Sequence, residues 1–304
     1  MAMATLSDFT AQFERIRPRL FGIAYRMLGT IEDGEDMVQE TFLRWQLADR
    51  ESIREPEGWL VSVVTRMSID RLRRARTERE AYEGQWLPEP LPSREWGRAD
   101  ERAELASDLS IAFLAMLERL SPEERAALLL REVFDCGYPE ISSVLEKSEA
   151  ACRQMVHRAR TRVQRDQPRF EVTPSVHERL VSRFLAALHA EDREGLLALV
   201  ADDVSWTSDG GGKVSAVRNV VRGADAIVRM LLGYQRKEEG RLTHRVSWLN
   251  GELTWVSYYR GQPFCATAFL TDGNRILGLY RVLNPDKLRH VQEAPALDPA
   301  SLNL

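Results

Sequence analysis

The sequence predicts a multidomain protein in which two all-helical domains, the second with a helix-turn-helix, precede an α+β domain. Apolar residues recur at helical spacing through most of the first 165 residues. The proline-rich run WLPEPLP interrupts that pattern, and strand-like alternation begins only after residue 203. The chain has 304 residues, which is enough for two domains or for three small ones.

The first helical domain is expected over residues 9–79. Apolar side chains at helical spacing predict one helix over residues 13–28 and a second over residues 33–47. The polar stretch 48–58 contains a proline and a glycine and is predicted to be a loop. A third helix is expected over residues 59–79.

A linker is expected over residues 80–104 and a second helical domain over residues 105–166. Ser121, followed by proline and two glutamates, has the composition of a helix start. Residues 139–145 and 149–165 are predicted to form two further helices joined by a tight turn. That spacing is typical of a helix-turn-helix, whose second helix enters the major groove of DNA. The linker contains Trp86, Leu87 and Leu91, which suggests that it docks on a protein surface.

An α+β domain is expected over residues 174–283, followed by a tail over residues 284–304. Helices are predicted to pack against a curved antiparallel sheet. The expected helices are 175–190, 193–200 and 224–237, and the expected strand-like segments are 204–207, 214–221, 242–249, 252–260, 264–271 and 275–283.

The distribution of charge along the chain points to a protein partner and to DNA. The net charge is −4, which by itself argues against a nucleic-acid binder. However, residues 32–40 contain five acids and no base, residues 66–79 contain six arginines against two acids, and residues 148–165 contain five arginines against one acid. The acidic helix is suited to a basic protein partner and the two arginine-rich helices to phosphate. The alternative is that all three are solvated helix faces.

Several functional classes are expected to be absent. No apolar run approaches the roughly 20 residues of a membrane span, and the charged N-terminal segment argues against a secretory signal. The three cysteines lie far apart without a CxxC spacing, which argues against a disulfide framework and a zinc site. We therefore expect a cytoplasmic protein with no cofactor and no metal.

The second helix of the helix-turn-helix carries side chains suited to reading bases. Arginine binds guanine edges with two hydrogen bonds and glutamine binds adenine, while further arginines contact phosphates. The residues expected to face DNA are Arg153, Gln154, His157 and Arg158.

Three motifs in order resemble extracytoplasmic-function sigma factors. EDGEDMVQETFLRW (32–45) resembles their polymerase-binding helix, GWLVSVVTRMSIDRLRRAR (58–76) their helix that reads the promoter −10 element, and residues 121–163 their −35 reading domain. The resemblance implies RNA polymerase core, through its clamp coiled coil and flap, and promoter DNA as partners. It implies that loop 48–58 holds a flipped base. It places at the clamp Asp33, Asp36, Gln39, Glu40, Phe42 and Trp45, and near the −10 strand Arg66, Arg71, Arg73 and Arg74.

Residues 174–283 resemble SnoaL-like, ketosteroid-isomerase-like cone domains, which a subgroup of these sigma factors carries at the C-terminus. The segments WLPEPL, DGGGK and NPDKL are similar to the marks of that subgroup. The resemblance implies regulation of the sigma domains in cis. The residues expected to make regulatory interdomain contacts are Trp86, Leu87, Pro88, Asp209, Gly210, Gly211, Gly212, Lys213, Asn284, Pro285, Asp286 and Lys287.

Two other functions are compatible with the sequence. One is a cone-fold isomerase, hydrolase or ligand sensor with a helical DNA-binding regulator, and the other is a one-component repressor. Asp209 and Tyr258 are a conceivable catalytic pair, but Asp209 lies in a glycine-rich segment and no catalysis is expected. A small-molecule ligand in the cone is left open. The aromatic residues that either line its pocket or fill its core are Trp206, Trp248, Trp255, Tyr258 and Phe269.

Overall fold

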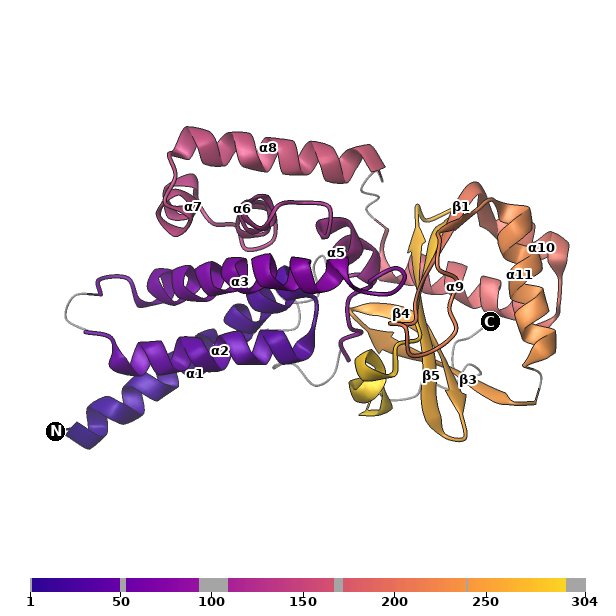
Figure 1. The fold of residues 1–304 in the computed structure, drawn as a ribbon, viewed down its shortest axis with the longest axis horizontal. Coiled ribbons are helices and arrows are strands. Elements are labelled where there is room, and N and C mark those ends of the chain that lie inside the picture. The colour runs from indigo at the N-terminus through magenta and orange to yellow at the C-terminus, as the bar shows by residue number, and fades with distance from the viewer. Residues whose placement is uncertain (1, 50–52, 93–108, 167–171, 239, 294–304) are drawn as a thin grey trace. The chain divides into compact units, whose positions relative to one another are not determined.

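The computed structural model describes residues 2–49, 53–92, 109–166, 172–238 and 240–293. Its internal contacts divide the chain into two compact units. The helical unit contains residues 1–80, 96–109 and 116–168. The C-terminal unit contains residues 81–95, 110–115 and 169–304. Figure 1 shows the helices and strands of both units as ribbons.

Three long helices open the helical unit: α1 (Ala2–Leu28), α2 (Ile31–Leu47) and α3 (Pro56–Glu80). The Thr30 side chain caps α2 by accepting the N–H of Asp33. Helix α3 begins three residues earlier than predicted, so Pro56 and Gly58 lie in the helix and not in a loop. Proline suits the first turn because its missing N–H would have no partner there. Residues 50–52 of the predicted loop lie outside the described residues.

The helix-turn-helix is present as predicted. Helix α6 (Pro122–Glu132) begins with a capping box between Ser121 and Glu124 and is followed by α7 (Tyr138–Leu145) and α8 (Glu149–Asp166). Glu146 adopts the left-handed conformation that forms the turn, with φ of 53°. The Ser148 hydroxyl accepts the N–H of Ala151 at 3.3 Å and so caps α8.

The two sets of helices pack together. Helix α1 contacts α6, and α3 contacts both α6 and α7, so the segments expected as domains 9–79 and 105–166 share one compact unit. Helix α5 (Ile111–Leu117) lies near the start of the expected second helical domain, but its first residues belong to the C-terminal unit.

The C-terminal unit packs helices α9 (Pro174–His189), α10 (Arg193–Leu199) and α11 (Ala224–Lys237) on a six-stranded sheet. The strand order is β2-β1-β6-β5-β4-β3, and the strands are β1 (Val200–Asp209), β2 (Val221–Arg222), β3 (Leu242–Leu249), β4 (Glu252–Tyr259), β5 (Gln262–Thr271) and β6 (Ile276–Val282).

The sheet differs from the prediction in two places. Strands β1 and β6 pair in parallel, although an antiparallel sheet was expected. Strands β3 to β6 reverse at each short turn, so β6 returns beside β1 in the same direction. Of the predicted strand-like segment 214–221, only Val221 lies in a strand, which it forms together with Arg222, while residues 210–220 form turns and irregular structure.

Both faces of the sheet are covered. On one face Phe184, Leu231 and Phe269 belong to the core formed with the three helices. On the other face Leu87 and residues 111–112 pack with side chains of the 3-10 helix η2 (Pro285–Glu293). The linker thus becomes part of this unit: residues 87–92 are all buried. Linker residues 93–104 and tail residues 294–304 lie outside the described residues.

Within the described chain, no helix is long and apolar enough to cross a membrane. No group of three or more His, Cys, Asp or Glu side chains among these residues could hold a metal ion.

Candidate functional site

The side chains predicted to read DNA on α8 lie on its exposed face. Arg153, Gln154, His157 and Arg158 are exposed, whereas the intervening apolar side chains are buried. Arg153 pairs with Glu149 at 2.7 Å, and Arg158 lies 3.8 Å from a carboxylate oxygen of Glu124. All four remain accessible to a partner.

On α3, Arg66 is engaged by the helix-turn-helix. Its Nε donates to the carbonyl oxygen of Val144 at 2.8 Å, and its Nη2 donates to that of Ser143 at 2.6 Å. Its Nη1 also pairs with Glu146 at 3.1 Å. Two carbonyls at the end of a helix and one acid therefore occupy a guanidinium predicted to lie beside DNA.

Two further arginines of α3 are also paired within the helical unit. Arg71 donates to Asp33 at 2.7 Å, and Arg73 pairs with Glu123. Arg74 is exposed, and its Nε makes only a long 3.5 Å contact with the backbone of its own helix. Of the four arginines predicted near the −10 strand, Arg74 is therefore the most accessible.

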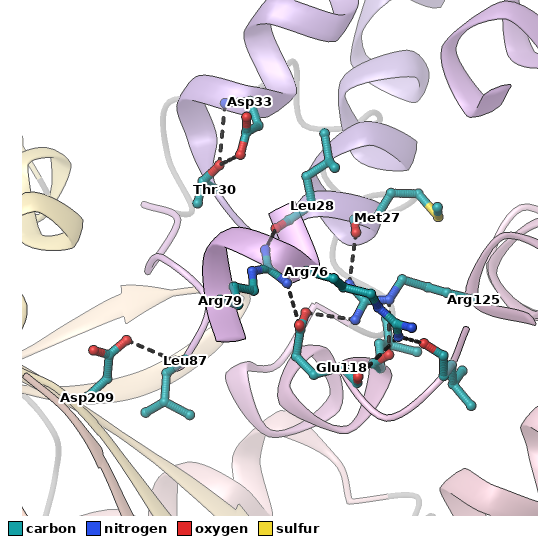
Figure 2. A network of polar contacts seen from close by, with 12 residues as sticks. Met27, Leu28, Thr30, Asp33, Arg76, Arg79, Leu87, Glu118, Arg125 and Asp209 are labelled. Atoms are coloured by element: carbon teal, nitrogen blue, oxygen red, sulfur yellow. Dashed lines mark hydrogen bonds and ion pairs between the residues drawn. The ribbon is translucent and has the colours of Figure 1, made fainter. Parts of the chain in front are cut away.

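A buried arginine network connects α1, α3 and α6 (Figure 2). Arg125 is 1% exposed and donates to the carbonyl of Met27, at the end of α1, at 2.8 Å. Glu118 accepts from Arg125 at 2.7 Å and also pairs with Arg79. Burial by itself raises the pKa of Glu118, but Arg125 and Arg79 outweigh it and hold that pKa below its usual value. These bonds satisfy carbonyls that a helix end leaves without partners.

The structure corrects the placement of one residue on α2. Trp45, expected to face the clamp, is 2% exposed and stacks on Phe9 with ring centroids 4.4 Å apart. Phe42 is half-buried against Phe13. Trp45 is therefore a core side chain and not a surface anchor, and Asp33 is partly used by Arg71 and the Thr30 cap.

The exposed face of α2 carries two leucines that the sequence analysis missed. Leu43 is 47% exposed and Leu47 is 88% exposed. They lie on one helical stripe with Asp36 and Glu40, at spacings of four, three and four residues. Gln39 is exposed beside this stripe. The sequence spacing could have identified Leu43 and Leu47, because it extends the acidic face of α2 toward its C-terminus.

In the C-terminal unit, Asp209 at the end of β1 holds the start of the linker. Its carboxylate is fully buried and accepts the hydroxyl of Tyr82 at 2.5 Å and the N–H of Leu87 at 2.9 Å. Figure 2 shows the bond to Leu87. Burial and the bond to Asp209 both raise the pKa of Tyr82. The linker is thus fixed through one carboxylate.

Lys287 of η2 supplies the opposite charge. Its Nζ lies 2.7 Å from Asp209 and donates to the carbonyl of Leu87 at 2.6 Å. The same ammonium lies 4.2 Å from the ring centroid of Trp86, a cation–π contact. Asn284 donates to the hydroxyl of Tyr82 at 2.9 Å. We call these residues (Tyr82, Trp86, Leu87, Asp209, Asn284 and Lys287) the linker clasp.

The glycine loop after β1 closes around the clasp. Gly211 and Gly212 have φ of 59° and 69°, which side chains rarely adopt. A Cβ on Gly211 would collide with Asn284 and one on Gly212 would lie 2.9 Å from Glu83. A Cβ on Gly210 would meet the backbone of its own loop. Gly211 and Gly212 therefore allow the linker and Asn284 to approach the loop, whereas Gly210 allows the loop to close on its own backbone.

The remaining predicted contact residues surround the clasp. Lys213 pairs with Asp286 at the surface, Pro88 is buried in the docked linker, and Pro285 is exposed at the start of η2. The conceivable catalytic pair is not assembled. Asp209 is enclosed by the clasp, while Tyr258 packs on the sheet face opposite the helices.

Two cavities of the C-terminal unit lie near the predicted pocket aromatics. Trp255 borders both cavities and Trp206 borders the smaller one. Phe269 and Trp248 pack with the core on the helical side of the sheet. The predicted aromatic set is therefore divided between cavity wall and core.

Comparison with known proteins identifies the helical segments. Residues 12–78 match Sigma-70 region 2, and residues 110–163 match Sigma-70, region 4. The chain is 37% identical over 289 residues to the ECF RNA polymerase sigma factor SigJ of Mycobacterium tuberculosis, covering 91% of this chain and 92% of that protein. It is 31% identical to the probable ECF RNA polymerase sigma factor SigI of the same species, covering 74% of this chain and 76% of that protein.

The crystal structure of Mycobacterium tuberculosis SigJ is similar over nearly the whole chain. The TM-score is 0.74 at 33% sequence identity, covering 93% of this chain and 98% of that one. The predicted fold class, two helical sigma domains followed by an α+β domain, is confirmed. Together these matches establish that the chain belongs to the ECF family of RNA polymerase sigma factors.

Proposed function

We propose that this sigma factor uses three helices to bind RNA polymerase core, the −10 element and the −35 element, and that its C-terminal unit regulates it in cis. Helix α2 binds the clamp coiled coil of RNA polymerase core through Asp36, Gln39, Glu40, Leu43 and Leu47. Helix α3 and the loop before it bind the −10 element, α8 binds the −35 element, and the helix-turn-helix domain contacts the flap.

The observation that carries the proposal is the contact of Arg66 with Ser143, at 2.6 Å. It joins the helix assigned to the −10 element to the helix-turn-helix assigned to the −35 element. The two elements lie about 25 base pairs apart by their names, which at about 3.4 Å per base pair is roughly 85 Å of DNA. An 18-residue helix such as α8 is only about 27 Å long. We therefore infer that α3 and the helix-turn-helix, while they are packed together through Arg66, do not read both elements at once.

We infer that polymerase core and promoter DNA separate α3 from the helix-turn-helix. Glu123 and Glu146, the acids that occupy Arg73 and Arg66, would be exchanged for phosphates. The pair of Arg66 and Glu146 has side chains 46% and 74% exposed, and such pairs contribute only about 0–1 kcal/mol each. Exposed ion pairs suit a contact that must open and close.

The C-terminal unit acts on this equilibrium through the linker. The clasp holds the chain that follows α3, at Tyr82, Trp86 and Leu87, and residues 111–112, which precede the helix-turn-helix domain, pack in the same unit. The C-terminal unit therefore holds the chain next to each of the two segments that must separate. Asp209 has no role as a base, because its carboxylate is committed to Tyr82, Leu87 and Lys287. We therefore assign the unit to regulation and not to catalysis.

Run-off transcription with core RNA polymerase tests the proposal. The full chain should direct transcripts from a cognate promoter, and deletion of residues 284–304, which removes Lys287, should change their amount. A chain inactive at every promoter, with and without these residues, would refute the assignment of α2, α3 and α8. An unchanged rate after the deletion would refute regulation through the clasp.

A further inference from the structure

The C-terminal unit contains two adjoining cavities on the helical side of its sheet. The larger, about 540 Å³, is bordered by α9, α11 and β3, and the smaller, about 220 Å³, by α11 and the sheet. Gln235, His244 and Trp255 line both. The smaller volume lies below the range of about 300–1,000 Å³ typical of sites for drug-sized molecules, so the smaller cavity suits a ligand of only a few atoms more than a ring.

Arg281 of β6 lines the smaller cavity and is 7% exposed. Its guanidinium lies over three rings, with centroid distances of 5.5 Å to Trp206, 5.8 Å to Tyr234 and 5.6 Å to Trp255. No described residue pairs with this guanidinium through a carboxylate or a side-chain hydrogen bond. Every other buried arginine or lysine named above has such a partner.

A buried charge without a counter-ion is costly, and cation–π contacts offset only part of that cost. The nearest ionisable groups do not supply the missing anion. Glu238 lines the same cavity, but its carboxylate pairs with Arg241 at 3.2 Å, and Lys237 adds positive charge. The site therefore retains a fixed positive charge between aromatic walls.

His244 reinforces this character. Its Nδ1 lies 2.9 Å from the hydroxyl of Ser257, and its ring packs against Trp255. Burial lowers the pKa of His244, and the charges of Arg281 and His189 lower it further. The imidazole is therefore neutral near pH 7 and adds a polar group to the cavity without adding a second charge.

We propose that the smaller cavity binds a small carboxylate with a planar, apolar body, its carboxylate on Arg281 and its body among Trp206, Tyr234 and Trp255. Guanidinium and carboxylate match in a two-bond geometry that a neutral group cannot reproduce. The aromatic walls suit a planar ligand body. This site is separate from the linker clasp and from the helical unit, so its occupancy is testable without transcription.

Binding to the full chain by calorimetry and by tryptophan fluorescence tests the proposal, with benzoate and indole-3-acetate as probes. Each carboxylate should bind at least about tenfold more tightly than its amide, benzamide or indole-3-acetamide, because one charged hydrogen bond corresponds to that factor or more. Equal binding of acid and amide would overturn the proposal. Binding of inorganic phosphate but of neither carboxylate would also overturn it.

Two arginine variants locate the site. Arg281→Met should weaken binding of the carboxylates at least about tenfold. Arg229→Met removes an exposed arginine of α11 that pairs with Asp225, and should bind them like the unaltered chain. Undiminished binding in Arg281→Met would contradict the proposal.

A measurement on the unaltered chain makes the test independent of how that variant folds. The Nε–H resonance of Arg281 should shift on addition of benzoate and not on addition of benzamide. The same shift with both, or with neither, would place the carboxylate elsewhere.

Discussion

In the helical unit Arg66 of α3 meets Glu146 at the surface, whereas in the C-terminal unit Asp209 and Lys287 meet inside the protein. The side chains of Arg66 and Glu146 are 46% and 74% exposed, but those of Lys287 and Asp209 are 8% and 0% exposed. Both pairs join segments that lie far apart in the sequence.

This difference in exposure indicates that the ion pair of Arg66 can open, whereas the ion pair of Lys287 persists. An exposed ion pair contributes about 0–1 kcal/mol and is weakened by salt, so DNA phosphates can replace its acid. Removing one partner of a buried pair leaves an uncompensated charge and costs about 3–5 kcal/mol. We therefore expect the contacts of α3 to rearrange during initiation while the linker stays on the sheet.

The largest expected effect is at the clasp. Asp209→Ala should lower the free energy of unfolding of the C-terminal unit by about 3–5 kcal/mol, because Lys287 would remain buried without its acid. Urea unfolding followed by tryptophan fluorescence measures this loss. Lys213→Met, which breaks the exposed pair with Asp286, is the matched control and should change stability by about 1 kcal/mol or less. Equal effects of the two variants would remove the distinction between the pairs.

A somewhat smaller loss of stability is expected at Glu118, which is less buried than Asp209 and more buried than Glu146. Glu118→Gln should destabilise the helical unit by about 2 kcal/mol at pH 7, because Arg125 loses its charged partner. The pKa of Glu118 is lowered in the folded protein, so its contribution is fully present above the unfolded value of about 4.3 and is lost as pH falls through the folded value. Urea unfolding of both proteins from pH 7 to pH 3 should therefore show the difference shrinking toward the acid end. A difference independent of pH would contradict the assigned ion pairs.

On α2 we expect the exposed leucines, Leu43 and Leu47, to contribute to binding of polymerase core and the buried Trp45 to contribute to the stability of the fold. The double variant Leu43→Ala, Leu47→Ala should weaken binding to polymerase core by roughly tenfold or more, as expected for apolar anchors in an interface, with little change in unfolding. Trp45→Ala is the counterpart and should destabilise the fold through the cavity that it leaves. Fluorescence titration with core and thermal unfolding measure the two properties. Unaltered core affinity in the double variant would mean that this face is only solvated.

The smallest effect is expected at the surface pairs of α3. Glu123→Gln combined with Glu146→Gln removes both acids and leaves Arg73 and Arg66 intact. Promoter binding in the presence of core should tighten by a few fold, and the gain should shrink with added salt. Weaker binding would show that these acids assist the DNA-bound state. Asp225→Asn, on the surface of α11, is a control for the loss of acidic charge.

Features carried by local spacing could be predicted from the sequence. The helical periodicity, the cap at Ser121, the turn at Glu146 and the exposed face of α8 depend on neighbouring residues and were found. The inward position of Trp45 could not be predicted, because an amphipathic helix with half-buried edges does not reveal which aromatic faces the other helices. The parallel pairing of β1 with β6 depends on how the intervening strands return.

The partners of charged side chains were equally hidden in the sequence. The arginines of α3 form a basic stripe in the sequence, but Glu123 and Glu146, the acids that occupy Arg73 and Arg66, lie 50 or more residues further along the chain. Asp209 looked like a loop residue, and only the docked linker and η2 reveal it as the buried centre of a clasp. Nothing in the sequence indicates that Arg281 lacks an acidic partner, because this becomes visible only once the neighbouring described residues are placed.

The central claim is that the packed helical unit opens to read the promoter, and a distance measurement tests it directly. Thr77 on α3 and Thr161 on α8 are both exposed and are not among the predicted DNA contacts, and the three native cysteines are buried, so Thr77→Cys with Thr161→Cys can carry spin labels. In the free protein the labels should give one short distance. On binding to core and promoter DNA that distance should lengthen by tens of ångströms, toward the roughly 85 Å between the two elements. An unchanged distance in a complex that makes transcripts would contradict the account.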